Sequence, residues 1–137
     1  MLTYTVLIKP TPDQINQITT LYRSEGWWSK PKDDPQQVKG IISGSHLFIV
    51  AKKGDEIVGM GRAISDRSSD AYIQDVTVKR EYRNQGIGTT IINELVTRLR
   101  KDGVEWIGLI AERGSHGFYS RLGFKQMPNS IPMLKTF

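Results

Sequence analysis

One stretch decides the fold, and it reads Asp75-Val76-Thr77-Val78-Lys79-Arg80-Glu81-Tyr82-Arg83-Asn84-Gln85-Gly86-Ile87-Gly88-Thr89-Thr90. The residues from Tyr72 to Val78 are rich in β-branched and aromatic types, which favour a strand. After the turn, apolar residues recur at the spacing of a helix, at Ile91, Ile92, Leu95 and Leu99. The stretch therefore predicts a strand, a tight basic turn and the start of a helix.

Two glycines, Gly86 and Gly88, lie in this turn. Glycine adopts positive φ without strain, and it has no Cβ to keep a ligand away from main-chain N–H groups. The N–H groups in the first turn of a helix have no intrahelical partner and carry the positive end of the helix dipole. The turn is therefore a candidate phosphate site. Taken alone, the glycine pair is equally typical of a close packing point between a strand and a helix.

Two common phosphate-binding patterns do not fit the turn. A P-loop requires a lysine directly after its last glycine, whereas Gly88 is followed by Thr89 and Thr90. The dinucleotide fingerprint requires a third glycine at position 91, where this chain has Ile91, although Glu105 lies at a suitable distance downstream. We therefore exclude the first pattern and disfavour the second.

A third pattern, R-x-x-G-x-G, is matched by Arg83 to Gly88 directly after the strand end Val76-Thr77-Val78. This motif resembles the acetyl-coenzyme A (acetyl-CoA) signature of the GNAT superfamily of N-acetyltransferases. The resemblance extends to Phe118-Tyr119-Ser120-Arg121-Leu122-Gly123-Phe124, which is similar to the late tyrosine-bearing segment of that family. Two motifs in the family's order are far more specific than either motif alone.

The resemblance implies a binding mode for acetyl-CoA as co-substrate. In the family, two parallel strands splay apart, and the pantetheine arm pairs with the main chain of the first strand while the glycine turn holds the pyrophosphate. Carried over to this chain, the expected cofactor-binding residues are Val76, Thr77, Val78, Arg83, Asn84, Gln85, Gly86, Ile87, Gly88 and Thr89.

The resemblance also implies a catalytic acid, Tyr119, which would protonate the departing sulfur. A tyrosine suits this step because its reference pKa of about 10 keeps it protonated at neutral pH. Without the first motif, a tyrosine on a short amphipathic helix would more often be a packed aromatic with a satisfied hydroxyl.

The general base is not evident from the sequence. Many family members have a glutamate in the strand after the glycine helix and an asparagine before the tyrosine helix, and this chain has neither. The candidate bases are Asp75, Glu112 and His116. For Asp75, a half-exposed carboxylate with no catalytic role is an equal alternative.

Composition narrows the class of protein. A chain of 137 residues is expected to form one domain, residues 1–137, with a single core. It has no cysteine, and its two histidines have no zinc spacing, so we expect no metal site. We see neither a membrane-spanning apolar run nor a signal peptide, and we expect a soluble cytoplasmic protein.

The formal net charge of +5 favours an anionic partner. Coenzyme A supplies one through its phosphates, and nucleic acid is the alternative. The basic residues are dispersed, however, and Arg98, Arg100 and Lys101 stand where cations stabilise a helix C-terminus. We therefore do not expect nucleic acid as the partner.

The expected architecture is α/β, with one mixed sheet of six to seven strands, helices on both faces and a βαβ acetyl-CoA-binding unit. Hydrophobic periodicity and turn signals predict the elements. The expected strands are Tyr4 to Lys9, His46 to Lys52, Glu56 to Ile64, Ala71 to Val78, Glu105 to Ala111 and Phe124 to Met127, with a further edge strand from Met133 to Phe137. The expected helices are Pro12 to Ser24, Pro35 to about Ile42, Ile87 to Lys101 and Gly114 to Leu122.

Two adjacent tryptophans, Trp27 and Trp28, follow the first expected helix. Adjacent residues of a regular element cannot both face one core, so at least one is expected to be partly exposed. Either both close the apolar edge of the helix, or one forms a wall of an acceptor pocket.

The sequence thus predicts an acyltransferase that moves an acetyl group from acetyl-CoA to a primary amine of a small molecule or a peptide, by direct attack on the thioester. A non-catalytic coenzyme A-binding module and a nucleic-acid-binding protein are the alternatives. The acceptor and the oligomeric state stay open, with a homodimer as one alternative.

Overall fold

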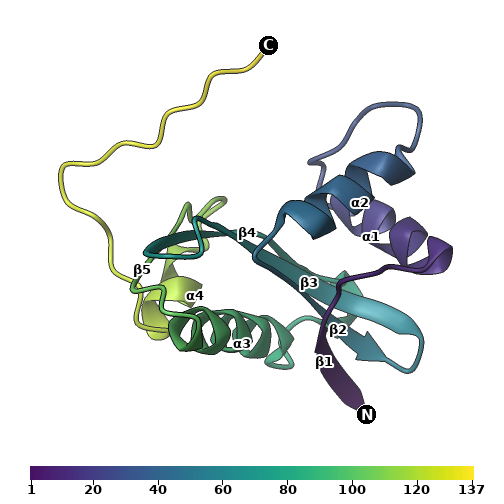
Figure 1. Cartoon of the computed structure of the whole chain (residues 1–137), viewed down its shortest axis with the longest axis horizontal. Helices are drawn as coiled ribbons and strands as arrows, with labels where there is room; N and C mark the ends of the chain where they lie inside the picture. The colour runs from purple at the N-terminus through teal and green to yellow at the C-terminus, as the bar shows by residue number, and fades with distance from the viewer.

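The computed structural model describes residues 1–137 and contains a five-stranded sheet in the order β1-β2-β3-β4-β5 (Figure 1). The strands are β1 (Leu2–Val6), β2 (Leu47–Lys53), β3 (Glu56–Ser65), β4 (Asp70–Val78) and β5 (Trp106–Leu109). The α-helices are α1 (Pro12–Ser24), α2 (Pro35–Gly44), α3 (Ile87–Lys101) and α4 (His116–Arg121), and a short 3₁₀ helix, η1 (Arg80–Tyr82), precedes the glycine turn. None of the helices is long and apolar enough to span a lipid bilayer.

Side chains of β2 alternate between two hydrophobic clusters, one on each face of the sheet. Leu47 and Ile49 belong to the cluster formed with α3, whereas Phe48 and Val50 belong to the cluster formed with α1 and α2. Because successive side chains of a strand point to opposite faces, this apolar run is buried on both sides. Figure 1 shows the result, with α1 and α2 covering one face and α3 and α4 the other.

Local sequence signals set the helix boundaries. Thr11 caps α1 in a reciprocal arrangement, in which its hydroxyl accepts from the Gln14 N–H and the Gln14 side chain accepts from the Thr11 N–H. Pro12 occupies the first helical position, where its missing N–H costs nothing. As a result, α1 has the boundaries that the sequence predicts, and α3 also has its predicted boundaries, with Gly86 as its N-cap.

A β-bulge interrupts the pairing of β3 with β4. Arg62 pairs with Gln74 and Met60 pairs with Thr77, so two residues, Asp75 and Val76, lie opposite Gly61. Asp75 has φ of 57°, in the left-handed region. The extra residue reverses the alternation of side chains along β4, so that Thr77 faces α1.

The three strands β2, β3 and β4 form an antiparallel meander, and β4 and β5 are parallel, with α3 between them in the sequence. The β4 to β5 pairing runs only from Asp70 with Trp106 to Ile73 with Leu109. Beyond Ile73, β4 has no strand partner on this side. Two strands that separate after a few pairs leave a gap in the sheet, and this gap positions the candidate site.

The expectation of six to seven strands is wrong, because the sheet has five. The segments Phe124 to Met127 and Met133 to Phe137 have no regular secondary structure, and the chain beyond Phe124 extends away from the other elements (Figure 1). Pro128 and Pro132 lack the N–H needed for strand pairing and divide this segment into short pieces. The strand expected from Glu105 to Ala111 is also shorter, because β4 diverges from it.

Candidate active site

A pocket of about 810 Å³ opens where β4 leaves β5. Ligand pockets are typically of this size, roughly 300–1,000 Å³. Its wall combines the second half of β4, the glycine turn, the start of α3 and the segment from Ile110 to Tyr119. The lining residues predicted from the sequence are Asp75, Val76, Thr77, Val78, Arg83, Asn84, Gly86, Ile87, Gly88, Thr89, Glu112 and Tyr119. Gln85 and His116 do not line the pocket.

The glycine turn leads directly into α3. Gly86 is the N-cap, with φ of 80°, and a Cβ at this position would have no heavy atom within 4 Å. The first main-chain bond of the helix runs from the Thr90 N–H to the Gly86 carbonyl, so the N–H groups of residues 87–89 have no helical acceptor. Open space beside free N–H groups fits the pyrophosphate of coenzyme A.

Arg83 connects this turn to the end of β4. Its Nε donates a 2.9 Å hydrogen bond to the carbonyl oxygen of Val78. One of its terminal nitrogens lies 2.9 Å from a carboxylate oxygen of Glu25. Arg83 therefore links the glycine turn to the residue that follows α1. Its side chain forms part of the pocket wall.

Tyr119 lies on α4 and also contributes to the wall of the pocket. Its ring packs edge-on against Phe118 and Phe124, with centroid distances of 5.0 and 5.9 Å. Burial raises the pKa of the Tyr119 hydroxyl, and the negative charge of Glu112 raises that pKa further. The hydroxyl therefore stays protonated well into the alkaline range, as a proton donor must.

Asp75 lies at the bulge and accepts hydrogen bonds from two residues, the neutral Tyr22 and the cationic Arg62. The Tyr22 hydroxyl donates to its carboxylate at 2.7 Å, and the Arg62 Nε donates to the same oxygen at 2.6 Å. Burial and the adjacent Asp75 charge raise the pKa of Tyr22, so this hydroxyl also keeps its proton. Asp75 is thus neutralised and held in place.

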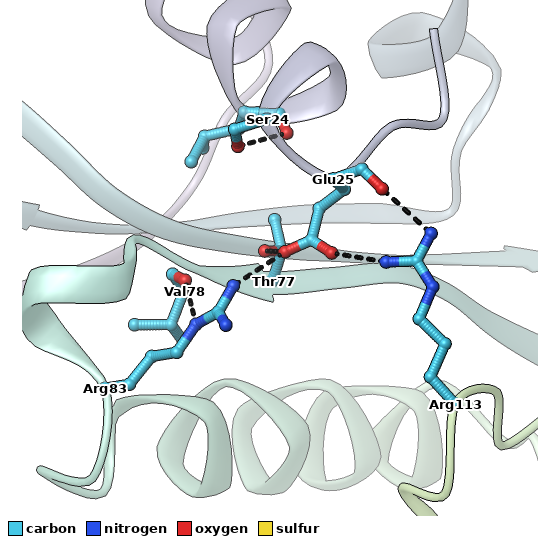
Figure 2. Close-up of polar contacts among 7 residues, drawn as sticks. Ser24, Glu25, Thr77, Val78, Arg83 and Arg113 are labelled. Atoms are coloured by element: carbon cyan, nitrogen blue, oxygen red, sulfur yellow. Dashed lines mark hydrogen bonds and ion pairs between the residues drawn. The ribbon is translucent and has the colours of Figure 1, made fainter.

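Glu25 was not predicted from the sequence, yet it lines the pocket. It follows α1 directly, and its carboxylate accepts from the Thr77 hydroxyl and pairs with Arg83 and Arg113 (Figure 2). These partners come from β4, the glycine turn and the loop after β5. No local pattern signals such a cluster, because its members are 52 to 88 residues from Glu25 in the sequence.

The two tryptophans have different surroundings. Trp28 stacks on Tyr22, with a centroid distance of 4.1 Å and an interplanar angle of 4°. Trp27 meets Tyr22 edge-on and also lines the pocket. Both therefore pack at the end of α1, and Trp27 in addition faces the site.

Comparison with known proteins identifies the fold and the family. Residues 13–124 match the model of the acetyltransferase (GNAT) family. The chain belongs to this family. GNAT enzymes are acetyl-CoA-dependent acyltransferases, and the pocket described above is the candidate acetyl-CoA site of this GNAT protein.

Relatives of this GNAT chain include an uncharacterized N-acetyltransferase, ycf52, from Pyropia yezoensis, which is 31% identical over 119 residues. That match covers 84% of this chain and 67% of the relative. GCN5-related N-acetyltransferase 2, chloroplastic, from Arabidopsis thaliana is 38% identical over 76 residues, which cover 56% of this chain and 30% of the relative.

Among solved structures, a protein of unknown function and probable acetyltransferase from meticillin-resistant Staphylococcus aureus superposes with a TM-score of 0.82. The match covers all of both chains, at 24% identity. At this identity the likeness establishes the GNAT fold alone. In the present GNAT chain, no group of three or more His, Cys, Asp and Glu side chains is arranged to hold a metal ion.

Proposed function

We propose that this acetyltransferase passes the acetyl group of acetyl-CoA directly to a primary amine of a small-molecule or peptide acceptor. One observation carries the proposal. A single pocket is bounded by the unpaired edge of β4, the glycine turn and Tyr119. Together they could bind coenzyme A and donate a proton to its departing sulfur.

The free N–H groups of residues 87–89 would bind the pyrophosphate, and Arg83 would add a cation beside it. The main chain of β4 from Gln74 to Val78 has no strand partner on the pocket side and would pair with the pantetheine arm. Fixing these remote groups places the thioester carbon at the centre of the pocket and lowers the entropic part of the barrier.

The reaction requires two proton movements. An alkylamine has a pKa of about 10.4, so it arrives protonated and must lose a proton before its nitrogen lone pair attacks the carbonyl carbon. As the new C–N bond forms and the C–S bond breaks, the sulfur needs a proton. Tyr119 would supply it, and Asp75 and Glu112 are pocket carboxylates that could receive the proton of the amine.

The aromatic side chains of Trp27 and Tyr72 in the pocket wall favour an aryl-alkylamine acceptor. A rice relative, 38% identical over 74 residues, is named serotonin N-acetyltransferase 2, chloroplastic. A soybean relative, 37% identical over 75 residues, is named histone acetyltransferase TAP1. Because of these two names, we choose tryptamine-type amines and histone-tail lysines as the first acceptors to test.

The test is a thiol-release assay with acetyl-CoA against aryl-alkylamines, histone-tail peptides, polyamines and aminoglycosides, alongside calorimetry of coenzyme A binding. We expect micromolar to millimolar coenzyme A binding and amine-dependent thiol release with at least one acceptor class. Coenzyme A binding with no thiol release from any amine would instead indicate a non-catalytic module. Absence of coenzyme A binding would refute the proposed function.

A further inference from the structure

Glu25 carries one negative charge and pairs with two arginines. Arg83 lies 2.9 Å from one carboxylate oxygen and Arg113 lies 3.1 Å from the other. Figure 2 shows the two guanidinium groups reaching Glu25 from opposite sides, across β4. We call these three residues the Glu25 clamp. It ties the glycine turn and the loop after β5 to the end of α1, and all three residues line the pocket.

The three side chains differ greatly in exposure. The Glu25 side chain is 14% exposed, whereas those of Arg83 and Arg113 are 47% and 60% exposed. Glu25 is also held by the Thr77 hydroxyl, while its main-chain carbonyl accepts a 2.8 Å hydrogen bond from Arg113. If the clamp opens, the long exposed arginines move and the carboxylate stays.

Asp75, the other deeply placed carboxylate of the pocket, differs in this respect. Its partners are Tyr22, which is buried, and Arg62, whose side chain is only 14% exposed. Because both partners are largely enclosed by protein, neither can swing into solvent and leave Asp75. Asp75 therefore keeps both partners when a ligand enters, whereas Glu25 can lose the exposed Arg83 to a competing anion.

The cofactor brings such an anion to the turn that carries Arg83. A pyrophosphate has more negative charge than one carboxylate and presents several oxygens to a planar guanidinium. When Arg83 turns to it, Glu25 loses part of its compensation. A carboxylate that is largely buried and short of a cation partner is costly, so it favours a new cation in the pocket.

We infer that Glu25 is the ammonium-binding site for the acceptor and becomes available only when the cofactor's pyrophosphate draws Arg83 away. The inference rests on the proposed function and deepens it. Glu25 would bind the acceptor's ammonium group beside Thr77 and accept one proton, and the neutral amine would then attack the thioester. Cofactor binding would thereby prepare the acceptor site and set the order of binding.

The test is Glu25→Gln, which keeps the shape of the side chain and removes its charge. Since Glu25 competes with the pyrophosphate for Arg83, the variant should bind coenzyme A at least about twofold tighter by calorimetry. Its kcat/KM for the best amine acceptor should fall by roughly 10²-fold or more, the usual scale for loss of a general base. A residue with a purely structural role would weaken both properties or neither.

Two controls isolate the mechanism. Asp33→Asn removes the same charge from an exposed pair with Arg23, outside the pocket, and should leave coenzyme A affinity within about twofold of wild type. Pantetheine lacks the pyrophosphate, so Glu25→Gln should not tighten its binding. Glu25→Asp replaces Glu25→Gln if the latter folds poorly. It retains the charge but shortens the reach of the carboxylate to the arginines. This variant should also bind coenzyme A more tightly than wild type.

Three results would overturn the inference while leaving the proposed function standing: unchanged or weaker coenzyme A binding by the Glu25 variants, equal tightening by Asp33→Asn, or equal tightening toward pantetheine. Full acceptor turnover by Glu25→Gln would also overturn it. If wild-type protein binds no coenzyme A at all, the proposed function fails first and the inference with it.

Discussion

The hydroxyl of Tyr22 donates a 2.7 Å hydrogen bond to Asp75 and so ties α1 to the bulge of β4 across 53 residues of sequence. The contact is largely buried, and Arg62 completes it from β3. Because Asp75 lies in the unpaired part of β4 and lines the pocket, this contact helps to fix the shape of the pocket wall.

Tyr22→Phe should lower the free energy of unfolding by about 1–3 kcal/mol, because it leaves the half-buried Asp75 carboxylate with one fewer donor while keeping the ring against Trp28. Urea unfolding followed by circular dichroism measures the change. Tyr4→Phe is the matched control, since the Tyr4 hydroxyl makes no hydrogen bond within the protein. An unchanged midpoint for Tyr22→Phe would mean that the contact does not stabilise the fold.

The same contact predicts a pH dependence of stability. The pKa of Tyr22 is raised in the folded state by burial and by Asp75, so the folded protein resists ionisation of this hydroxyl. The unfolded chain releases the proton near its reference value of about 10, so the contribution of Tyr22 to stability should be constant below that pH and fall as pH rises above it. Tyr22→Phe should lose stability less steeply above pH 10 than wild type. Parallel curves for the two proteins would contradict this assignment.

Gly86→Val tests the glycine turn. The residue has φ of 80°, which a β-branched side chain adopts only with strain, so the turn should shift and displace the free N–H groups of α3. We expect coenzyme A affinity by calorimetry to fall at least about tenfold, or 1.4 kcal/mol. Gly40→Val, on α2 with no positive φ and open space around it, should retain wild-type affinity. Unchanged binding by Gly86→Val would remove the turn from the cofactor site.

The variant Tyr119→Phe tests whether the protein is an enzyme that uses Tyr119 as its acid or a non-catalytic binding module. It preserves the packing against Phe118 and Phe124 and removes only the proton donor. If the hydroxyl protonates the sulfur, kcat should fall by about 10²- to 10⁴-fold while the Kd for coenzyme A changes little. Steady-state kinetics with the best acceptor, together with calorimetry, give both values. A variant that retains kcat would leave Tyr119 as a packing residue.

The raised pKa of Tyr119 sets the sign of its pH effect. Since burial and Glu112 raise this pKa above its usual value of about 10, the hydroxyl keeps its proton at neutral and mildly alkaline pH. The kcat of wild type should therefore show no alkaline decline below pH 10. A decline centred between pH 7 and 9 would indicate that another group acts as the acid.

Sequence reasoning located the helices well, because their signals are local. Thr11 and Pro12 mark the start of α1, and Gly86 and Gly103 flank α3, so these boundaries need no knowledge of the rest of the fold. Strands depend on partners far away in the sequence. The segment from Met133 to Phe137 has an apolar pattern but no pairing strand, and the count of strands was therefore wrong.

The residues of the candidate site likewise fall into those that a local motif predicts and those that depend on distant packing. The residues that line the pocket and carry a family motif, such as Gly86 and Tyr119, could be named in advance, although their roles stay predictions. Glu25 could not, because its position depends on the packing of α1, β4 and two loops. Gln85 belongs to the motif but lies outside the pocket wall, because a turn presents only some of its residues to one side.

The bulge at Asp75 makes the site sensitive to chain length in a way that point substitutions do not reveal. Nearly every residue type has the same main-chain amide. The unpaired main chain of β4 can therefore keep its binding groups while the side-chain sequence diverges among homologues. Deleting one residue at the bulge would instead leave a single residue opposite Gly61, and the regular pairing that results would remove the local bend and twist of β4. Thr77 would still pair with Met60, but the left-handed conformation of Asp75 would be lost, and with it the contact of this carboxylate with Tyr22 and Arg62. Natural variation in this protein should accordingly be rich in replacements along β4 and free of single-residue deletions there.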